Sequence, residues 1–127
     1  MKKATRAWVR KAEGDWRVAQ REAAATDPVK EAVCFHSQQC AEKYLKAYLQ
    51  ELGLSIPRTH DLERLLADLV PRDASLRSLR PRLVILTRYA VDFRYPGFSI
   101  SIRAMHAALR HVRIIRFKVR AILGLPP

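Results

Sequence analysis

The sequence contains no asparagine and only four glycines among its 127 residues. It also lacks the alternation of apolar and polar residues that is typical of a half-buried β-strand. No apolar run approaches the roughly 20 residues that a transmembrane helix needs. The first residues are basic, without the apolar segment of a secretory signal. These absences predict a helical, cytoplasmic protein that is neither secreted nor embedded in a membrane.

Cysteine is equally sparse, with only Cys34 and Cys40 present. The two residues lie six positions apart, on different faces of an expected helix, which is too far for a disulfide within the chain. Two cysteines are also too few for a disulfide scaffold. We therefore expect two reduced, buried thiols, as is usual in cytoplasmic proteins.

Acidic residues are scarce in the second half of a chain whose formal net charge is +12. Residues 1–70 hold 12 basic and 10 acidic side chains, whereas residues 71–127 hold 12 basic and 2 acidic ones. Arginine outnumbers lysine 17 to 7, and arginine binds phosphate as a planar fork. The second half should therefore meet an anionic partner, such as a nucleic acid, a nucleotide, an acidic protein or an anionic membrane surface. A GC-rich genome or a thermophilic host would also favour arginine.

Apolar residues recur at helical spacing nearly throughout the chain. The spacing predicts four long helices, over about 3–25, 28–52, 75–93 and 100–123, and a short one between 61 and 70. The inward-facing side chains are expected to be Trp8, Ala12, Trp16, Ala19 and Ala23; Val29, Val33, Phe35, Cys40, Tyr44, Leu45, Ala47, Tyr48, Leu49 and Leu52; Leu62, Leu65, Leu66 and Leu69; Leu79, Leu83, Leu86, Ala90 and Phe93; and Met105, Ala108, Leu109, Val112, Ile115, Val119 and Leu123. Short connections between such helices predict one all-α domain over residues 1–127, a five-helix up-and-down bundle.

Several residues are expected to set the helix ends. Asp27 is a candidate N-cap for the second helix, with Pro28 as its first residue. Either Thr59 or Asp61 should cap the third helix. Pro81 predicts a late start or a kink in the fourth helix, because proline lacks a backbone N–H group.

The common signatures of catalytic and cofactor sites are missing from the sequence. The four histidines form no H-x-x-x-H pair, there is no C-x-x-C, and no acidic cluster lies near them, so no metal site is predicted. No glycine-rich phosphate loop and no G-x-S-x-G nucleophile motif occur either. We therefore predict no metal and no cofactor.

One stripe of the fifth helix is basic. On a 3.6-residue period Arg103, His106, Arg110 and Arg113 line up, and Arg120 continues the row. Segment 101–120 holds six Lys and Arg residues and no acidic residue. Neighbouring cations repel one another by a few tenths of a kcal/mol per pair, so an anionic ligand would stabilise the stripe. The alternatives are a solvated face or ion pairs with acidic residues of the first three helices.

A second candidate site lies around the end of the fourth helix, in the segment Thr87–Gly97. Arg88 and Arg94 could bind phosphate while Tyr89 and Tyr95 stack on bases, an arrangement that suits single-stranded nucleic acid. The alternative is that both tyrosines pack the end of the bundle and that Arg88 pairs with Asp92, four residues on.

A third candidate is the dipeptide His60-Asp61. It could act as an acid–base couple, although a role in capping the third helix and shaping the loop before it is the interpretation that the sequence favours.

Four segments resemble the HEPN domain family (higher eukaryotes and prokaryotes nucleotide-binding). Residues 35–47, Phe-His-Ser-Gln-Gln-Cys-Ala-Glu-Lys-Tyr-Leu-Lys-Ala, resemble its signature second helix. Residues 8–15 resemble its opening helix, residues 58–62 its loop into the third helix, and residues 94–97 its conserved turn. The resemblance implies a homodimeric all-α bundle of HEPN type, in prokaryotes often encoded beside a minimal nucleotidyltransferase as a toxin–antitoxin pair.

Many members of that family are metal-independent ribonucleases with an R-x4-6-H motif. Their arginine holds the scissile phosphate while their histidine moves the proton. No arginine of this sequence is followed by a histidine at that spacing. Where the motif is expected, Arg88 is followed after six residues by Tyr95, and a tyrosine with an ordinary pKa near ~10 is a poor general base at neutral pH. Arg88 and Tyr95 are therefore the only catalytic candidates that the motif position offers.

The sequence thus favours a nucleotide- or RNA-binding protein that acts with a nucleotidyltransferase. The binding residues are expected to be Arg88, Arg94, Tyr95, Arg103, His106, Arg110 and Arg113. One alternative is a ribonuclease that uses Arg88 or Arg94 with Tyr95, or with His106 of a second subunit. Another is an interaction module whose basic stripe meets an acidic chain. A homodimer or larger homo-oligomer is expected in each case, because the second helix is apolar on two sides.

Overall fold

The structure, a computed structural model, describes residues 1–90 and 95–127. Within these residues all regular structure is helical, as the sequence predicted. The α-helices are α1 (Lys3–Ala23), α2 (Lys30–Glu51), α3 (Leu62–Leu69), α4 (Arg80–Thr87) and α5 (Ile102–Ile122). Two 3-10 helices, η1 (Ala74–Leu79) and η2 (Arg88–Ala90), flank α4. No described helix has both the length and the apolar character that crossing a membrane requires.

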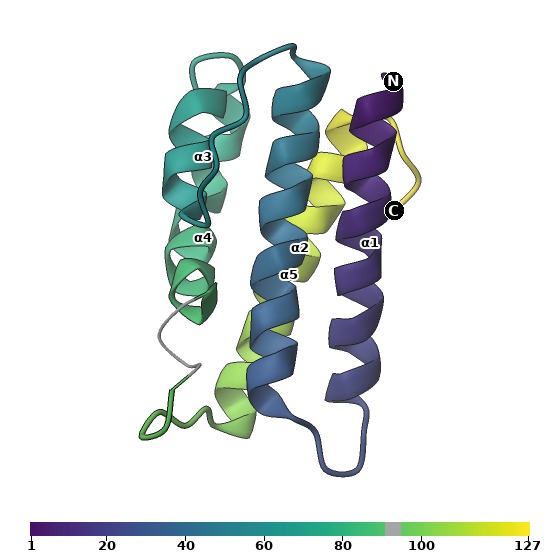
Figure 1. The fold of residues 1–127 in the computed structure, drawn as a ribbon. Helices are drawn as coiled ribbons and strands as arrows, with labels where there is room; N and C mark the ends of the chain where they lie inside the picture. Colours follow the sequence, from purple (N-terminus) through teal and green to yellow (C-terminus); the bar gives the residue numbers. More distant parts are fainter. Residues whose placement is uncertain (91–94) are drawn as a thin grey trace.

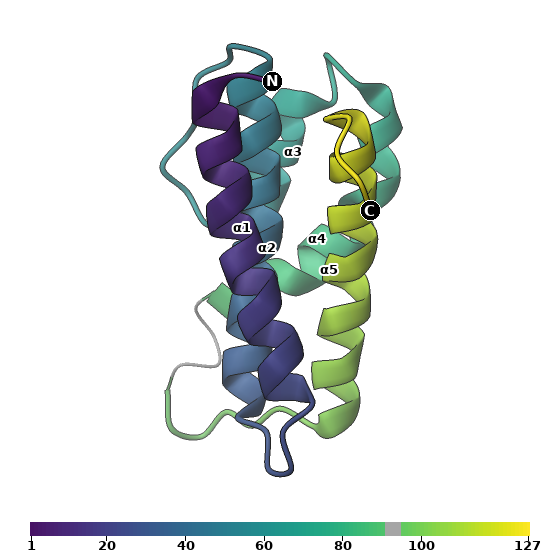
Figure 2. The same cartoon turned by 90° about the vertical axis from the view of Figure 1, so that its right-hand side faces the viewer.

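Helix α2 runs through the middle of the bundle. Figures 1 and 2 show α1 and α2 as an antiparallel pair, with α5 packed along them and the α3–α4 unit on the other side of α2. The N-terminus of α1 and the C-terminal end of α5 lie at the same end of the bundle (Figure 1). The core is formed by Val9, Ala12 and Trp16 of α1, by α2, by the leucines of α3 and α4, and by Met105, Val112, Ile115 and Val119 of α5.

The central position of α2 explains its apolar circumference. Its buried residues include both apolar sides predicted from the sequence, for example Tyr44 and Leu49. Neighbouring helices of the same chain cover both sides, so the apolar character of α2 needs no second subunit to bury it. Val29 is the exception to the predicted inward set, because it precedes the helix and is more than half exposed.

The predicted start of α2 is wrong by two residues. Val29, and not Asp27, occupies the N-cap position, with no side-chain cap, and Pro28 lies outside the helix. The carboxylate of Glu22, near the end of α1, accepts a hydrogen bond from the Val29 N–H at 2.9 Å. A side chain from the preceding helix therefore binds a backbone donor that Asp27 was expected to help satisfy.

The predicted fourth helix, 75–93, is broken into three pieces in the structure. Residues 74–79 form the 3-10 helix η1, and the α-helix begins only at Arg80, with Pro81 in its first turn. Proline cannot donate to the preceding turn, so the continuous helix is interrupted there. The late start is thus confirmed, whereas Phe93, predicted to face inward, lies outside the described residues.

Candidate nucleic-acid surface

The basic residues of α5 separate into an outer row and an inner group, and Arg120 of the predicted stripe falls into the inner group together with Arg116. Arg103, His106 and Arg110 form the outer row and are exposed. None of the three side chains makes a hydrogen bond or an ion pair with any residue in the two described ranges. At 1.5 Å rise per residue, the row extends about 10 Å along the helix. It is an uncompensated basic surface.

The inner group, Arg116 and Arg120, points toward α1 instead. Arg116 donates from Nε and Nη2 to the two carboxylate oxygens of Glu13 at 2.8 and 2.7 Å, a bidentate pair. Arg120 lies 3.5 Å from the same carboxylate and donates to the Tyr44 hydroxyl at 2.9 Å. That hydroxyl in turn donates to Glu13 at 2.6 Å. Through these contacts, Arg116 and Arg120 hold α5 against α1 and α2.

The Glu13 carboxyl shows the electrostatic effect of this arrangement. Its partial burial by itself would raise its pKa, but the hydrogen bonds from Arg116 and Tyr44 and the nearby arginine charges lower the pKa overall. Burial and the bond to Glu13 raise the pKa of the Tyr44 hydroxyl, which therefore stays protonated at neutral pH. The group is a fixed structural network and offers no reactive side chain.

Arg113 lies between the two groups. Its guanidinium sits 5.9 Å from the centre of the Trp16 ring, while the residue remains exposed. Arg116 approaches the same ring at 5.2 Å. Arg113 therefore contacts α1 through a cation–π interaction and still presents charge to solvent.

The segment around Tyr95 lies just before α5. Tyr95 is 62% exposed, and Pro96-Gly97 form a turn in which Gly97 adopts a positive φ of 96°. Arg88 is exposed in η2, at the end of α4. The remaining candidate of this segment, Arg94, and the predicted Arg88–Asp92 pair lie outside the described residues. Because α5 begins at Ile102, Tyr95 and Arg103 belong to the same end of the bundle.

Tyr95 borders an aromatic pocket that the sequence did not predict. The pocket has a volume of about 600 Å³ and lies between the start of α2 and the 95–98 turn. Its lining residues are Glu31, Ala32, Phe35, His36, Tyr89, Tyr95, Pro96 and Phe98. Phe35 and His36 belong to the signature stretch of the second helix, but only the fold shows that they face the Tyr95 turn. Tyr89 is buried, so it packs the end of the bundle.

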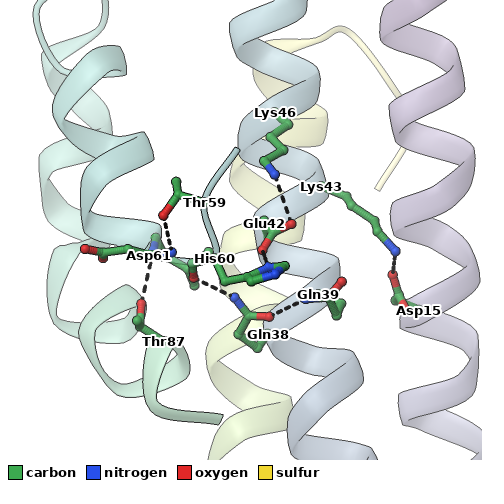
Figure 3. Close-up of polar contacts among 11 residues, drawn as sticks. Asp15, Gln38, Gln39, Glu42, Lys43, Lys46, Thr59, His60, Asp61 and Thr87 are labelled. Carbon is green, nitrogen blue, oxygen red and sulfur yellow. Dashed lines mark hydrogen bonds and ion pairs between the residues drawn. The ribbon is translucent and has the colours of Figure 1, made fainter. Parts of the chain in front are cut away.

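The dipeptide His60-Asp61 is structural, as the sequence favoured. Asp61 caps α3 by accepting a hydrogen bond from the Glu63 N–H at 3.0 Å. His60 Nδ1 bonds to the buried Glu42 carboxylate at 2.7 Å, and its carbonyl accepts from Gln38 at 2.9 Å (Figure 3). Three polar residues of α2 thus take part in tying down the loop, because Lys46 also pairs with Glu42 at 3.1 Å.

Two other polar residues of the signature stretch, His36 and Lys43, bind Asp15 of α1. Asp15 accepts from Lys43 at 2.6 Å and bonds His36 Nδ1 at 2.8 Å. Figure 3 shows Lys43 directed to α1 while Gln38 and Glu42 face the His60 loop. The signature stretch 35–47 therefore positions the helices on both sides of α2.

The structure offers no metal cluster or activated thiol in the part of the chain that it describes. No group of three or more His, Cys, Asp or Glu side chains is placed to hold a metal ion there. Both cysteines are free and buried. Burial raises the pKa of the Cys34 thiol to about 12, and it also raises the pKa of Cys40. Thiolate chemistry at neutral pH is therefore disfavoured.

Comparison with known proteins assigns the fold to a family. The family model described as "HEPN domain" matches residues 5–122. The chain belongs to the HEPN family. Among solved structures, TT1696 from Thermus thermophilus is 27% identical with a TM-score of 0.79, covering 92% of this chain and 96% of that one. ST0689, described as an archaeal HEPN homologue, is 25% identical with a TM-score of 0.74, covering 95% and 98%. No curated protein matches.

The assignment confirms the resemblance found in the sequence and extends it. The four resembling segments end at residue 97, whereas the HEPN match continues through nearly all of α5. The all-helical HEPN fold is therefore shown for the helix that carries the basic row.

Proposed function

We propose that this HEPN protein binds the phosphates of RNA or of nucleotides along the outer row of α5. The observation that carries the proposal is that Arg103, His106 and Arg110 are exposed without any carboxylate partner among the described residues. Residues 93–127 contain no aspartate or glutamate at all. Arginine pairs with phosphate as a two-pronged donor, so a polyanion would supply the missing counter-charge.

The pocket beside Tyr95 supports a nucleotide in preference to a simple anion. Its exposed tyrosine can stack on a base, and its other aromatic residues give it an apolar wall. Arg88, at the end of α4, and Arg113, one turn after Arg110 on α5, are exposed as well. The proposed binding set is therefore Arg88, Tyr95, Arg103, His106, Arg110 and Arg113, and Arg94 belongs to it from the sequence alone.

A nucleotidyltransferase partner, a toxin–antitoxin role and a homodimer are part of the same proposal, and the family resemblance supports them. The apolar circumference of α2 no longer supports a dimer, because the chain itself buries it. A dimer would have to use the exposed apolar side chains elsewhere on the surface, such as Phe98 and Ile102 at the start of α5.

The test measures binding of a fluorescein-labelled 12-nucleotide RNA, and separately of ATP, over a range of salt concentrations. Removing two phosphate contacts with Arg103→Ala/Arg110→Ala should weaken RNA binding at least tenfold. It should also reduce the slope of log affinity against log salt by about 2. The matched control is Arg17→Ala/Arg21→Ala, which removes two exposed charges from α1. Equal losses in both variants, or no salt-dependent binding by the wild type, would disprove the proposal.

A second candidate function is RNA cleavage, favoured by the position of His106. It lies one turn from both Arg103 and Arg110, at spacings that place side chains side by side on a helix. The arginines could hold a phosphate while the imidazole moves a proton. In EDTA, His106→Ala and Arg103→Ala/Arg110→Ala should each abolish cleavage of the RNA. No cleavage by the wild type, or equal cleavage by both variants and the wild type, would exclude this function.

A further inference from the structure

The outer face of α5 becomes apolar beyond the basic row. Ile114 is 40% and Phe117 58% exposed, and Ala121 follows one turn later on the same side. Phe117 comes seven residues after Arg110, so it lies about 10 Å further along the helix. The apolar face begins directly after Arg113 and includes none of the residues proposed to bind RNA.

A groove runs beside these residues, between α5 and the η1–α4 junction. It has a volume of about 530 Å³. Leu79 and Ile122 form its apolar floor together with Ile114 and Phe117. The residues of α5 that build the core, such as Val112 and Val119, are on the opposite side of the helix. Burial of the core therefore does not explain why the outer side is apolar.

Two cations that form no ion pair with a described carboxylate border the groove, although the charge of Lys118 helps to lower the pKa of Asp73. Arg82 donates from Nη1 to Nδ1 of His111 at 3.0 Å, and Lys118 lies 3.5 Å from the Ser78 hydroxyl. Burial, together with the charges of Arg82 and Arg110, lowers the pKa of His111, so its imidazole stays neutral and accepts the bond. Neither cation forms an ion pair with a described residue.

We propose that this groove binds an acidic amphipathic helix of a different protein. Apolar side chains of such a helix, repeating at three- and four-residue spacing, would cover Phe117 and Ile114. Its carboxylates would pair with Arg82 and Lys118. The proposal does not depend on RNA binding, because it uses other residues and another stretch of α5.

The charge of the protein favours this occupant over a second copy of the chain. Each copy carries a formal net charge of +12, and α5 contributes no acidic side chain. Packing two such faces together would bring like charges close in an apolar setting. RNA fits less well, because Phe117 is the only aromatic side chain among the lining residues, and the aliphatic Ile114 and Leu79 give bases no further stacking surface.

The experiment uses the full chain and a synthetic 18-residue peptide with leucine at helical spacing and glutamate elsewhere. A peptide of the same composition in scrambled order is the control ligand. Fluorescence anisotropy should show micromolar binding of the amphipathic peptide and at least tenfold weaker binding of the scrambled one. Phe117→Ser and Lys118→Glu should each weaken binding about tenfold. Val18→Ser, which removes a similarly exposed apolar side chain from α1, should leave it unchanged.

Several results would overturn the proposal. The first is equal binding of both peptides, since charge alone would then account for it. A second is unchanged binding by Phe117→Ser. A third is a concentration-dependent dimer of the wild type, measured by analytical ultracentrifugation, that Phe117→Ser dissociates, because a second copy would then occupy the groove. A fourth is a loss of RNA affinity in Phe117→Ser as large as in Arg103→Ala/Arg110→Ala.

Discussion

The inner and outer arginines of α5 share one helix but differ in what they contact. Arg116 and Arg120 are mostly buried and share the carboxylate of Glu13, whereas Arg103 and Arg110 are exposed and have no carboxylate partner among the described residues. The inner pair joins α5 to α1 and α2. The outer pair stabilises nothing that the structure describes, and that difference is the basis of the proposal that it binds a ligand.

The same difference shows that the net charge of a segment does not reveal which of its basic side chains can bind a ligand. The second half of the chain is strongly basic, yet part of that charge is neutralised by Glu13, which lies 103 residues away in sequence from Arg116. Among the arginines of α5, those on the outer side remain available to a ligand. Substitutions that remove one group or the other should therefore separate stability from binding.

Removal of the shared carboxylate should have the largest effect on stability. In Glu13→Ala, Arg116 and the Tyr44 hydroxyl lose a hydrogen-bond acceptor, and Arg120 loses its ion-pair partner. We expect the free energy of unfolding to fall by about 2–4 kcal/mol, because an unpaired, partly buried charge is costly. Urea denaturation followed by circular dichroism measures it. The control is Asp27→Ala, which removes an exposed acid from the loop between α1 and α2 and should change stability by less than about 0.5 kcal/mol.

A double-mutant cycle sharpens this result. If Glu13 acts through Arg116, then Glu13→Ala/Arg116→Ala should cost clearly less than the two single substitutions combined, with a coupling of about 1–3 kcal/mol. The cycle Glu13→Ala/Arg103→Ala should show a coupling near zero. A coupling of similar size in both cycles would mean that the inner and outer arginines are not distinct.

The inner network should also make stability depend on acid pH. The pKa of Glu13 is lower in the folded protein than its ordinary value of 4.5. A depressed carboxyl contributes stability above its unfolded pKa and loses it as the pH falls through the folded pKa. The stability difference between the wild type and Glu13→Gln should therefore be full at neutral pH and shrink below about pH 4.5.

Urea titrations of both proteins between pH 2 and pH 7 test this. Asp73 and Glu51 also have lowered pKa values, but they are common to the two proteins and cancel in the comparison. A difference that stays constant down to pH 2 would show that Glu13 is not held ionised by the arginines.

Much of the fold follows from the sequence for a simple reason. Leucines and alanines at helical spacing, as in Leu62, Leu65, Leu66 and Leu69, define a buried stripe whatever lies opposite it. The break in the fourth helix is also visible, as Pro81. The N-cap of α2 was mispredicted because Glu22, from another helix, satisfies the Val29 N–H, which local pattern does not reveal.

The site was harder to predict than the fold. A helical period places Arg113 and Arg120 in the same stripe as Arg103, since it records only angles around one helix. Which part of that stripe meets α1 depends on how the helices pack. The aromatic pocket was missed for the same reason, because Phe35 and Tyr95 are far apart in sequence and meet only in three dimensions.

Arg113 should contribute to stability, as the inner arginines do, and also to RNA binding, as the outer arginines do. Arg113→Ala removes the cation–π contact with Trp16, so we expect a stability loss of about 0.5–1 kcal/mol. It should also weaken RNA binding, though less than Arg103→Ala does, because part of its guanidinium faces the ring. Urea denaturation and RNA titration of the same variant measure both effects. An Arg113→Ala protein with unchanged stability and a full loss of affinity would place Arg113 in the outer row.

The smallest effect on stability is expected for the outer row itself. Arg103→Ala and Arg110→Ala should each change the free energy of unfolding by less than about 0.5 kcal/mol. The change can be stabilising, because each substitution removes one of several like charges from the same helix face. Low salt should enlarge any stabilisation, since repulsion between exposed charges is screened by salt. Urea denaturation at low and at near-physiological salt measures both. A loss above about 1 kcal/mol would mean that these arginines support the fold, and their exposure would then no longer argue for a ligand.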